Sequence, residues 1–255
     1  MSRHRETLHR DAIRGGLLAR LARRPSAEAY ALRGGVRIAQ LLPERSRRVG
    51  DVDLVRPGGA LEDVERELRA ALRDDTLGDG VRFHPTRWRI DRFHPASRHA
   101  GLRLIAAGEA GGRRDRLVVD VVLGLELWPV PEWTRVAGVR LRAATRATIL
   151  GTKLKVLAEL GPGRWRAKDL ADALCLARHA PPATGELGEA IERAWAQGSP
   201  RCASAGALLA SDGWWRGAEA ERGWASLRAS HQDLPRLDGA VRELRHRLVR
   251  ATGTR

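Results

Sequence analysis

Hydrophobic residues recur along this chain with two different periods. Spacings of three and four, as in Leu61, Val64, Leu68 and Leu72, are typical of amphipathic helices. Alternating or continuous apolar runs bounded by glycine or charge indicate strands. The predicted helices cover residues 3–24, 36–42, 61–72, 144–160, 166–179, 185–196, 204–209, 218–230 and 237–251, and the predicted strands cover residues 49–55, 81–92, 102–107 and 117–123.

The order of these elements predicts the fold class. Strands end near residue 125 and helices dominate after about residue 145, with the proline-rich segment 128–131 between them. Residues 108–116 have the glycines and charges of a hairpin turn. We predict an α+β fold with a small mixed sheet, flanking helices and a helical C-terminal part. The expected domains are a core over residues 1–143 and a helical domain over residues 144–255.

Composition narrows the class of partner. The 255 residues include 46 Lys and Arg against 31 Asp and Glu, which gives a formal net charge of +15. Such a charge favours a polyanion such as RNA or DNA, although a generally arginine-rich surface is the alternative. No apolar run is long enough for a membrane helix, and the N-terminal residues lack a signal-peptide pattern. Cys175 and Cys202 lack metal-ligand spacing, so we expect a reducing, cytoplasmic location.

Two glycines and two aspartates suggest phosphate and metal chemistry. The pair Gly34-Gly35 lets a backbone approach a phosphate closely, because no side chain intervenes. Asp51 and Asp53 are two residues apart, so on a strand both carboxylates point to one face. Together these residues predict a nucleotide triphosphate beside a divalent metal. An exposed strand end is the other explanation for the aspartates.

A third carboxylate belongs to the same hypothesis. Asp120 lies in the middle of the apolar strand predicted over residues 117–123. A lone ionised carboxylate buried there would be costly, and a metal would remove that cost. The alternative is a buried acid paired with an arginine. Mg²⁺ prefers hard oxygen ligands, so Asp51, Asp53 and Asp120 are the candidate metal ligands.

The lysines supply an independent indication. Only three of the 46 basic residues are lysine, namely Lys153, Lys155 and Lys168, and they lie within sixteen positions. A lysine offers a compact point charge, which suits triphosphate binding better than the planar guanidinium of arginine does. Lys153 and Lys155 cannot share one helix face, because they are two residues apart. One of them is therefore expected at the surface.

These motifs together resemble the AbiEii/AbiGii toxin family of the DNA polymerase β-like nucleotidyltransferase superfamily. The resemblance begins with Gly34-Gly35 and Gly50-Asp51-Val52-Asp53-Leu54 and continues through Leu117-Val118-Val119-Asp120-Val121. It extends through Thr148-Ile149-Leu150-Gly151-Thr152-Lys153-Leu154 and ends at Arg166-Ala167-Lys168-Asp169-Leu170-Ala171-Asp172. It covers roughly residues 28–180, with four motifs in the order of the family.

The resemblance implies a role for each matched residue. Gly34 and Gly35 would face the nucleotide phosphates, and Lys153 would contact the triphosphate, with Lys168 nearby. Asp169 would lie at the edge of the active site as the acid of the last motif. Asp51 and Asp53 would hold Mg²⁺. Asp120 would complete the metal site or help to activate the acceptor hydroxyl.

The resemblance also implies an activity and partners. The expected activity is Mg²⁺-dependent transfer of NMP from an NTP to an acceptor hydroxyl, because some relatives add nucleotides to tRNA 3′ ends and block aminoacylation. The chain would then be the toxin of a type IV toxin–antitoxin pair with a cognate antitoxin. The helical domain would complete the active site.

The chain departs from the family pattern at three positions. Val36 and Gly50 stand where the family often has Ser or Thr, and Thr152 replaces the usual glutamate before Lys153. Two alternatives therefore stay open. One is a nucleotidyltransferase that acts on a small molecule or a protein hydroxyl. The other is a non-catalytic module that binds RNA or the antitoxin on the same scaffold.

Overall fold

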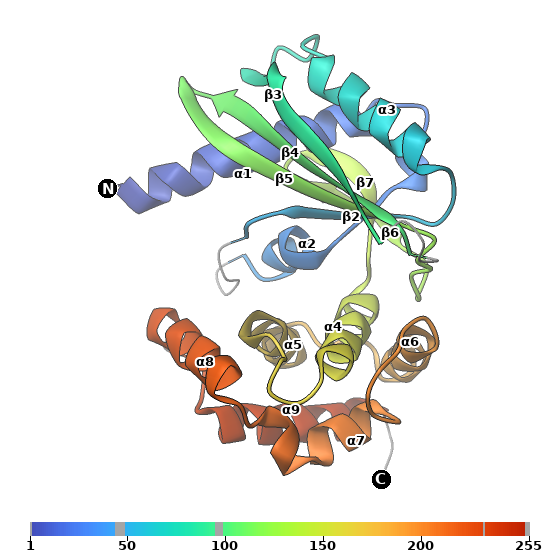
Figure 1. Cartoon of the computed structure of the whole chain (residues 1–255), viewed down its shortest axis with the longest axis vertical. Coiled ribbons are helices and arrows are strands. Elements are labelled where there is room, and N and C mark those ends of the chain that lie inside the picture. The colour runs from blue at the N-terminus through green and yellow to red at the C-terminus, as the bar shows by residue number, and fades with distance from the viewer. Residues whose placement is uncertain (1, 44–48, 95–98, 232, 253–255) are drawn as a thin grey trace. The chain divides into compact units, whose positions relative to one another are not determined.

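A mixed sheet forms the N-terminal part of the molecule (Figure 1). The computed structural model describes residues 2–43, 49–94, 99–231 and 233–252, and in these the sheet has seven strands in the order β3-β4-β5-β2-β1-β7-β6. Strand β2 runs parallel to β5 and β1 runs parallel to β7, whereas the other neighbours are antiparallel. The strands are β1 (Ala31–Arg33), β2 (Val52–Arg56), β3 (Val81–Phe93), β4 (Gly101–Ala110), β5 (Arg113–Leu123), β6 (Glu132–Val136) and β7 (Val139–Ala143).

Helices α1 (Ser2–Ala22) and α3 (Leu61–Arg73) cover one face of this sheet (Figure 1). Their apolar stripes bury residues such as Leu17 and Leu68 against Val52 and Leu104 of the strands. Successive side chains of a strand point to opposite faces of the sheet, so every second side chain points away from α1 and α3. Helix α2 (Gly34–Leu41) begins directly after β1, and this junction places the paired glycines.

The C-terminal part is helical and has its own core. It comprises α4 (Arg146–Leu160), α5 (Ala167–His179), α6 (Thr184–Ala196), α7 (Ala205–Ala210), α8 (Ala218–Ser230) and α9 (Leu237–Thr252). Helix α4 packs closely on α6, where a Cβ added at Gly151 would lie 2.9 Å from the carbonyl oxygen of Ala190. The tryptophans Trp165, Trp214, Trp215 and Trp224 are buried in this core.

The chain divides into two compact units. The sheet unit consists of Met1–Gln40, Arg48–Glu126 and Pro131–Ala143, and the helical unit consists of Leu41–Arg47, Leu127–Val130 and Ala144–Arg255. The helical unit thus takes two short segments from the part of the chain that the sequence analysis assigned to the core. Among the described residues, no helix combines the length and apolar character needed to cross a membrane.

The α+β class and the mixed sheet are confirmed, and the predicted helices form with small differences at their ends. The hairpin turn predicted over residues 108–116 is too long, because β4 and β5 extend to a tight turn at Gly111-Gly112, both at positive φ. The strand predicted over residues 49–55 begins only at Val52. Strands β1, β6 and β7 were not predicted, since three to five residues beside glycines or prolines show too little periodicity.

Candidate active site

The three candidate metal ligands lie on two neighbouring parallel strands of the sheet unit. Strand β2 pairs with β5 so that Asp53 lies directly opposite Asp120. Asp51 precedes β2 by one residue and shares the face of Asp53, because side chains alternate along an extended chain. All three side chains are half-buried, whereas Val52 and Val119 beside them are buried. The fold therefore brings acids from two distant stretches of sequence to one face.

Asp53 and Asp120 belong to a row of charged residues that crosses five strands. Asp91 lies opposite Arg103, Arg103 opposite Asp120, Asp120 opposite Asp53, and Asp53 opposite Arg33. Residues in such register positions project to the same face of a sheet. An arginine thus flanks the two adjacent acids on either side, which offsets the repulsion between their carboxylates.

Arg103 holds Asp120 through two parallel hydrogen bonds. Its Nε donates to Oδ1 of Asp120 at 2.7 Å and its Nη2 donates to Oδ2 at 2.6 Å. The hydrogen bond and charge of Asp120 raise the pKa of Arg103, and the charges of Asp51 and Asp53 raise it further. The guanidinium therefore lies in the field of all three carboxylates. This is the acid–arginine pair that the sequence left as the alternative for Asp120.

Gly34 lies against the carboxylate of Asp53. Its φ is +66°, and an added Cβ would be 2.0 Å from Oδ2 of Asp53. Only glycine satisfies both conditions, because other residues avoid this backbone region and carry the Cβ. Gly35 follows in the buried first turn of α2. The paired glycines thus put the backbone at the start of a helix next to a candidate metal ligand.

Arg14 of α1 anchors the segment that leads to Asp51. Its Nη2 donates to the carbonyl oxygen of Val49 and, at 3.4 Å, to that of Gly50, while its Nη1 donates to Oδ1 of Asp11 at 3.0 Å. Burial lowers the pKa of Arg14 and outweighs the opposing effect of Asp11. A buried cation therefore fixes the backbone immediately before the first candidate ligand.

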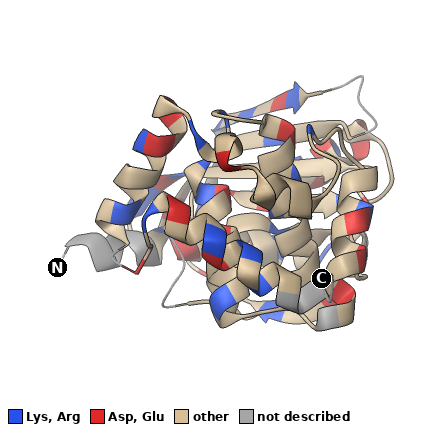
Figure 2. Cartoon of the chain, turned by 90° about the horizontal axis from the view of Figure 1, so that it is seen from below, with Lys and Arg blue, Asp and Glu red and all other residues tan. Residues whose placement is uncertain are grey.

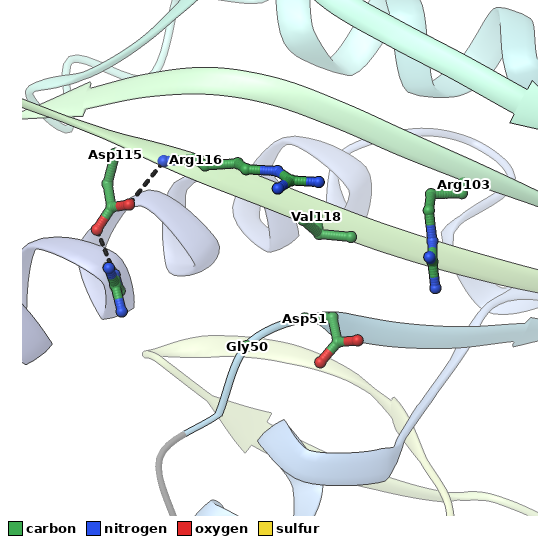
Figure 3. Close-up of a pocket in the computed structure, with 7 residues that line it drawn as sticks. Gly50, Asp51, Arg103, Asp115, Arg116 and Val118 are labelled. Atoms are coloured by element: carbon green, nitrogen blue, oxygen red, sulfur yellow. Dashed lines mark hydrogen bonds and ion pairs between the residues drawn. The ribbon is translucent and has the colours of Figure 1, made fainter.

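A pocket of about 360 Å³ opens beside Asp51 in the sheet unit (Figure 3). Figure 3 shows Arg116 and Val118 along β5. The side chain of Arg103 extends from β4 to the side on which Asp51 lies. Arg10 forms an ion pair with Asp115 at the other end of the pocket. The lining is Arg10, Gly50, Asp51, Arg103, Asp115, Arg116 and Val118.

The helical unit contains a separate buried ion cluster. Nζ of Lys153 on α4 donates to Oδ1 of Asp169 at 2.7 Å and to Oδ2 of Asp172 at 2.8 Å, both on α5. Arg166 donates through Nε to the other oxygen of Asp169 at 2.6 Å. An ammonium group has three donors, so one remains on Lys153 for a further acceptor.

Burial and charge oppose each other in this cluster. Burial lowers the pKa of Lys153, but the charges of Asp172 and Asp169 outweigh it and hold the pKa above the ordinary lysine value. Burial likewise raises the pKa of Asp169, and Lys153 and Arg166 reverse this to a net lowering. Lys153 and Asp169 therefore each stabilise the charged form of the other.

The remaining lysines also belong to the helical unit, and the side chain of Lys155 is as exposed as that of Lys153, at 13% each. Lys155 forms an i,i+4 ion pair with Glu159 at 3.2 Å, and Lys168 is half-buried in the first turn of α5. Lys153 and Lys155 have different partners, as expected for positions two residues apart on a helix. The expectation that one of them lies at the surface is wrong, because both are half-buried. Basic and acidic residues are interspersed over the helices in Figure 2, so the charge is not gathered into one block in that view.

The donor chemistry of Asp51 and Asp53 fits a divalent cation, because carboxylate oxygens are preferred ligands of Mg²⁺. In the part of the chain that the structure describes, however, no group of three or more His, Cys, Asp or Glu side chains is gathered closely enough to hold a metal. Asp120 gives both of its oxygens to Arg103. A metal site that includes all three acids therefore stays a prediction.

Arg14, Arg103 and Arg116 were missed by the sequence analysis. Arg14 interrupts the apolar face of its helix between Ile13 and Leu17, which is the one local signal of a buried cation. Arg103 lies between Leu102 and Leu104, and Arg116 ends the charged run 113–116 at the start of β5; both patterns are typical of exposed arginines. Their importance depends on strand register, which the sequence pattern does not specify.

Comparison with protein families gives a match over most of the chain. The family model described as nucleotidyl transferase AbiEii toxin of type IV toxin–antitoxin systems matches residues 16–241. No curated protein sequence matches the chain.

Two solved structures from Helicobacter pylori share the fold. JHP933 is 15% identical with a TM-score of 0.58, over 97% of this chain and 92% of that one. A putative nucleotidyltransferase is 14% identical with a TM-score of 0.60, over 99% of this chain and 96% of that one. The family match spans the acids, the paired glycines and the lysine cluster alike, and the chain therefore belongs to the AbiEii family of nucleotidyltransferase toxins.

Proposed function

We propose that this nucleotidyltransferase requires Mg²⁺ and transfers NMP from an NTP to the 3′ hydroxyl of an RNA, with tRNA as the expected acceptor. The observation that carries the proposal is the register of β2 and β5, which places Asp53 opposite Asp120 with Asp51 on the same face. Gly34 lies against this acid pair. An NTP phosphate and hard-oxygen ligands for a cation would thereby meet at one place.

The reaction is a single displacement at the α-phosphorus. The hydroxyl oxygen of the acceptor forms a bond to the α-phosphorus, and the bond from that phosphorus to the oxygen bridging the β-phosphate breaks. The electron pair leaves with pyrophosphate, and the hydroxyl proton passes to a carboxylate of the site, for which Asp120 is our candidate. When bound, Mg²⁺ would supply charge neutralisation at the hydroxyl and at the leaving pyrophosphate.

The residues of the chain would contribute mainly position and charge. Asp51 and Asp53 would hold the cation, and Gly34 would leave room for the phosphates. Within the helical unit, Lys153 joins α4 to α5 through its two bonded carboxylates, and its remaining donor makes it our candidate for a phosphate contact. No covalent enzyme intermediate is required.

The net charge of +15 and the arginines beside Asp51 support RNA as the acceptor. A polyanion gains from this charge through the release of its counterions. A cationic small molecule would be repelled by the same charge, so we place it second. The family description supports a toxin role with a cognate antitoxin.

The decisive test is transfer of label from α-³²P-NTP to tRNA. The chain is incubated with each NTP, total tRNA and Mg²⁺, and the products are separated on denaturing gels. We expect labelled tRNA with the wild type, none with Asp53→Asn, and wild-type levels with Asp75→Asn, since Asp75 is an exposed aspartate outside the site. EDTA should abolish labelling and added Mg²⁺ should restore it. Circular dichroism verifies that both variants fold.

Other outcomes would overturn defined parts of the proposal. Label that enters only small molecules or protein would overturn RNA as the acceptor. Equal labelling by Asp53→Asn and Asp75→Asn would overturn the assignment of the site. Absence of Mg²⁺-dependent NTP binding in calorimetry would favour a non-catalytic binding module.

A further inference from the structure

Five charged residues line the pocket beside Asp51. Asp115 forms an ion pair with Arg10 at one end of the pocket. Burial raises the pKa of the Asp115 carboxyl, but the hydrogen bond and charge of Arg10 outweigh this effect and lower the pKa. Arg103 is hydrogen-bonded to both carboxylate oxygens of Asp120. With these two pairs set aside, the lining leaves Arg116 and Asp51 as its other charges.

Arg116 is an available cation. Its guanidinium makes no hydrogen bond or ion pair with the described residues, and its backbone N–H donates to Asp115 at 2.7 Å. Its side chain is exposed, lines the pocket and extends along β5 toward Val118 (Figure 3). A guanidinium in this state binds phosphate through paired hydrogen bonds at little cost, because no partner must be displaced.

The sheet order separates this pocket from the paired glycines. In the order β4-β5-β2-β1, Gly34 follows β1 on one side of β2, the strand of Asp53, whereas Arg103 and Arg116 belong to β4 and β5 on its other side. Phosphoryl transfer requires the attacking and leaving oxygens to be roughly in line on opposite sides of the phosphorus. If the NTP phosphates lie on the glycine side, the attacking hydroxyl approaches from the side of β4 and β5, which carry Arg103 and Arg116.

We propose that this pocket is the acceptor subsite and that it binds the last nucleotide of a polynucleotide chain. Arg116 binds the phosphodiester on the 5′ side of that nucleotide, and the free hydroxyl lies toward Asp51. The volume of about 360 Å³ is within the range of small-ligand pockets, roughly 300–1,000 Å³. This inference rests on the proposed function and assigns the pocket and the residue that bind its acceptor. A small-molecule acceptor without a phosphate would have no use for Arg116.

The test compares Arg116→Gln with Arg113→Gln. Both variants remove one positive charge from β5, and Arg113 is exposed but does not line the pocket. Binding of a 12-nucleotide single-stranded RNA with a 5′ fluorescein and a free 3′ hydroxyl is measured by fluorescence anisotropy at several salt concentrations. We expect Arg116→Gln to weaken binding about tenfold relative to Arg113→Gln, as for loss of one charge-assisted hydrogen-bonded contact. NTP affinity in calorimetry should be the same in both variants.

A second readout separates this inference from the proposed function. In the labelling assay, Arg116→Gln should raise the KM for RNA and leave the KM for NTP unchanged. Equal RNA affinity and equal KM in the two variants would overturn the acceptor subsite, even if the wild type labels RNA. A difference in RNA affinity without any labelling by the wild type would support the subsite and overturn the proposed activity.

Discussion

Replacement of Gly34 by alanine tests whether the position of Asp53 depends on the glycine. The added Cβ would lie 2.0 Å from Oδ2, 2.6 Å from Cγ and 2.9 Å from Cβ of Asp53, whereas such contacts are essentially never shorter than 3.0 Å. The carboxylate oxygen must therefore move by at least 1.0 Å, the difference between 3.0 and 2.0 Å. Because the Cβ of Asp53 is also too close, rotation of the side chain alone does not remove the overlap. The backbone of β1 or β2 must shift as well.

The expected magnitude has two parts. The φ of +66° at Gly34 costs a residue with a Cβ roughly 1–2 kcal/mol, and overpacking adds about 1–3 kcal/mol. The free energy of unfolding should thus fall by about 2–5 kcal/mol. Displacement of a reacting group by about 1 Å lowers enzyme rates by roughly 100-fold, so labelling should fall by about this factor.

Gly50→Ala is the matched control. Gly50 also lies next to a candidate ligand, but an added Cβ meets nothing within 4 Å and its φ is outside the left-handed region. Its unfolding free energy should change by no more than about 0.5 kcal/mol. Both variants are compared by urea unfolding followed with circular dichroism and by transfer from α-³²P-NTP. If Gly34→Ala matches Gly50→Ala in both assays, the contact between Gly34 and Asp53 does not organise the site.

Three further predictions concern the ion pairs. Lys153→Met should lower the free energy of unfolding by about 3–5 kcal/mol in urea titrations, because two buried carboxylates lose their shared ammonium. Glu243 has a pKa lowered to about 2, chiefly by hydrogen bonding to Arg178. Its contribution to stability is therefore complete above the unfolded pKa of about 4.3. That contribution should be lost as the pH falls toward about 2, so the difference in Tm between wild type and Glu243→Gln should shrink over this interval. Arg103→Gln should bind Mn²⁺ several-fold more tightly in electron paramagnetic resonance titrations, because Asp120 is released from its bidentate partner.

Each of these predictions has a result that contradicts it. For Lys153→Met, a change no larger than that of Lys155→Met, whose ion pair with Glu159 is less buried, would show that the cluster is not a stabilising unit. For Glu243→Gln, a difference in Tm that does not vary with pH would contradict the ion pair. For Arg103→Gln, unchanged or weaker Mn²⁺ binding would show that Arg103 does not compete for Asp120.

Much of the secondary structure could be predicted because periodicity is a local property. The spacing of Leu61, Val64, Leu68 and Leu72 predicts α3, and the last three are buried in the structure. The short strands β1, β6 and β7 carry no such signal, and they form because a neighbouring strand supplies their hydrogen bonds. The units likewise depart from a simple cut in the sequence, since Leu127–Val130 belongs to the helical unit.

The sequence by itself determined the chemistry that is available. It contains an Asp-x-Asp pair, an aspartate within an apolar strand, a glycine pair and three clustered lysines, and the resemblance of these motifs to the AbiEii/AbiGii family implies a nucleotidyltransferase. Only the tertiary structure decided which groups meet. Strand register selects Arg103 among the many arginines as the partner of Asp120, and it places Asp53 opposite that acid. Register is set by the packing of whole strands, and a shift of one residue would turn these side chains to the other face.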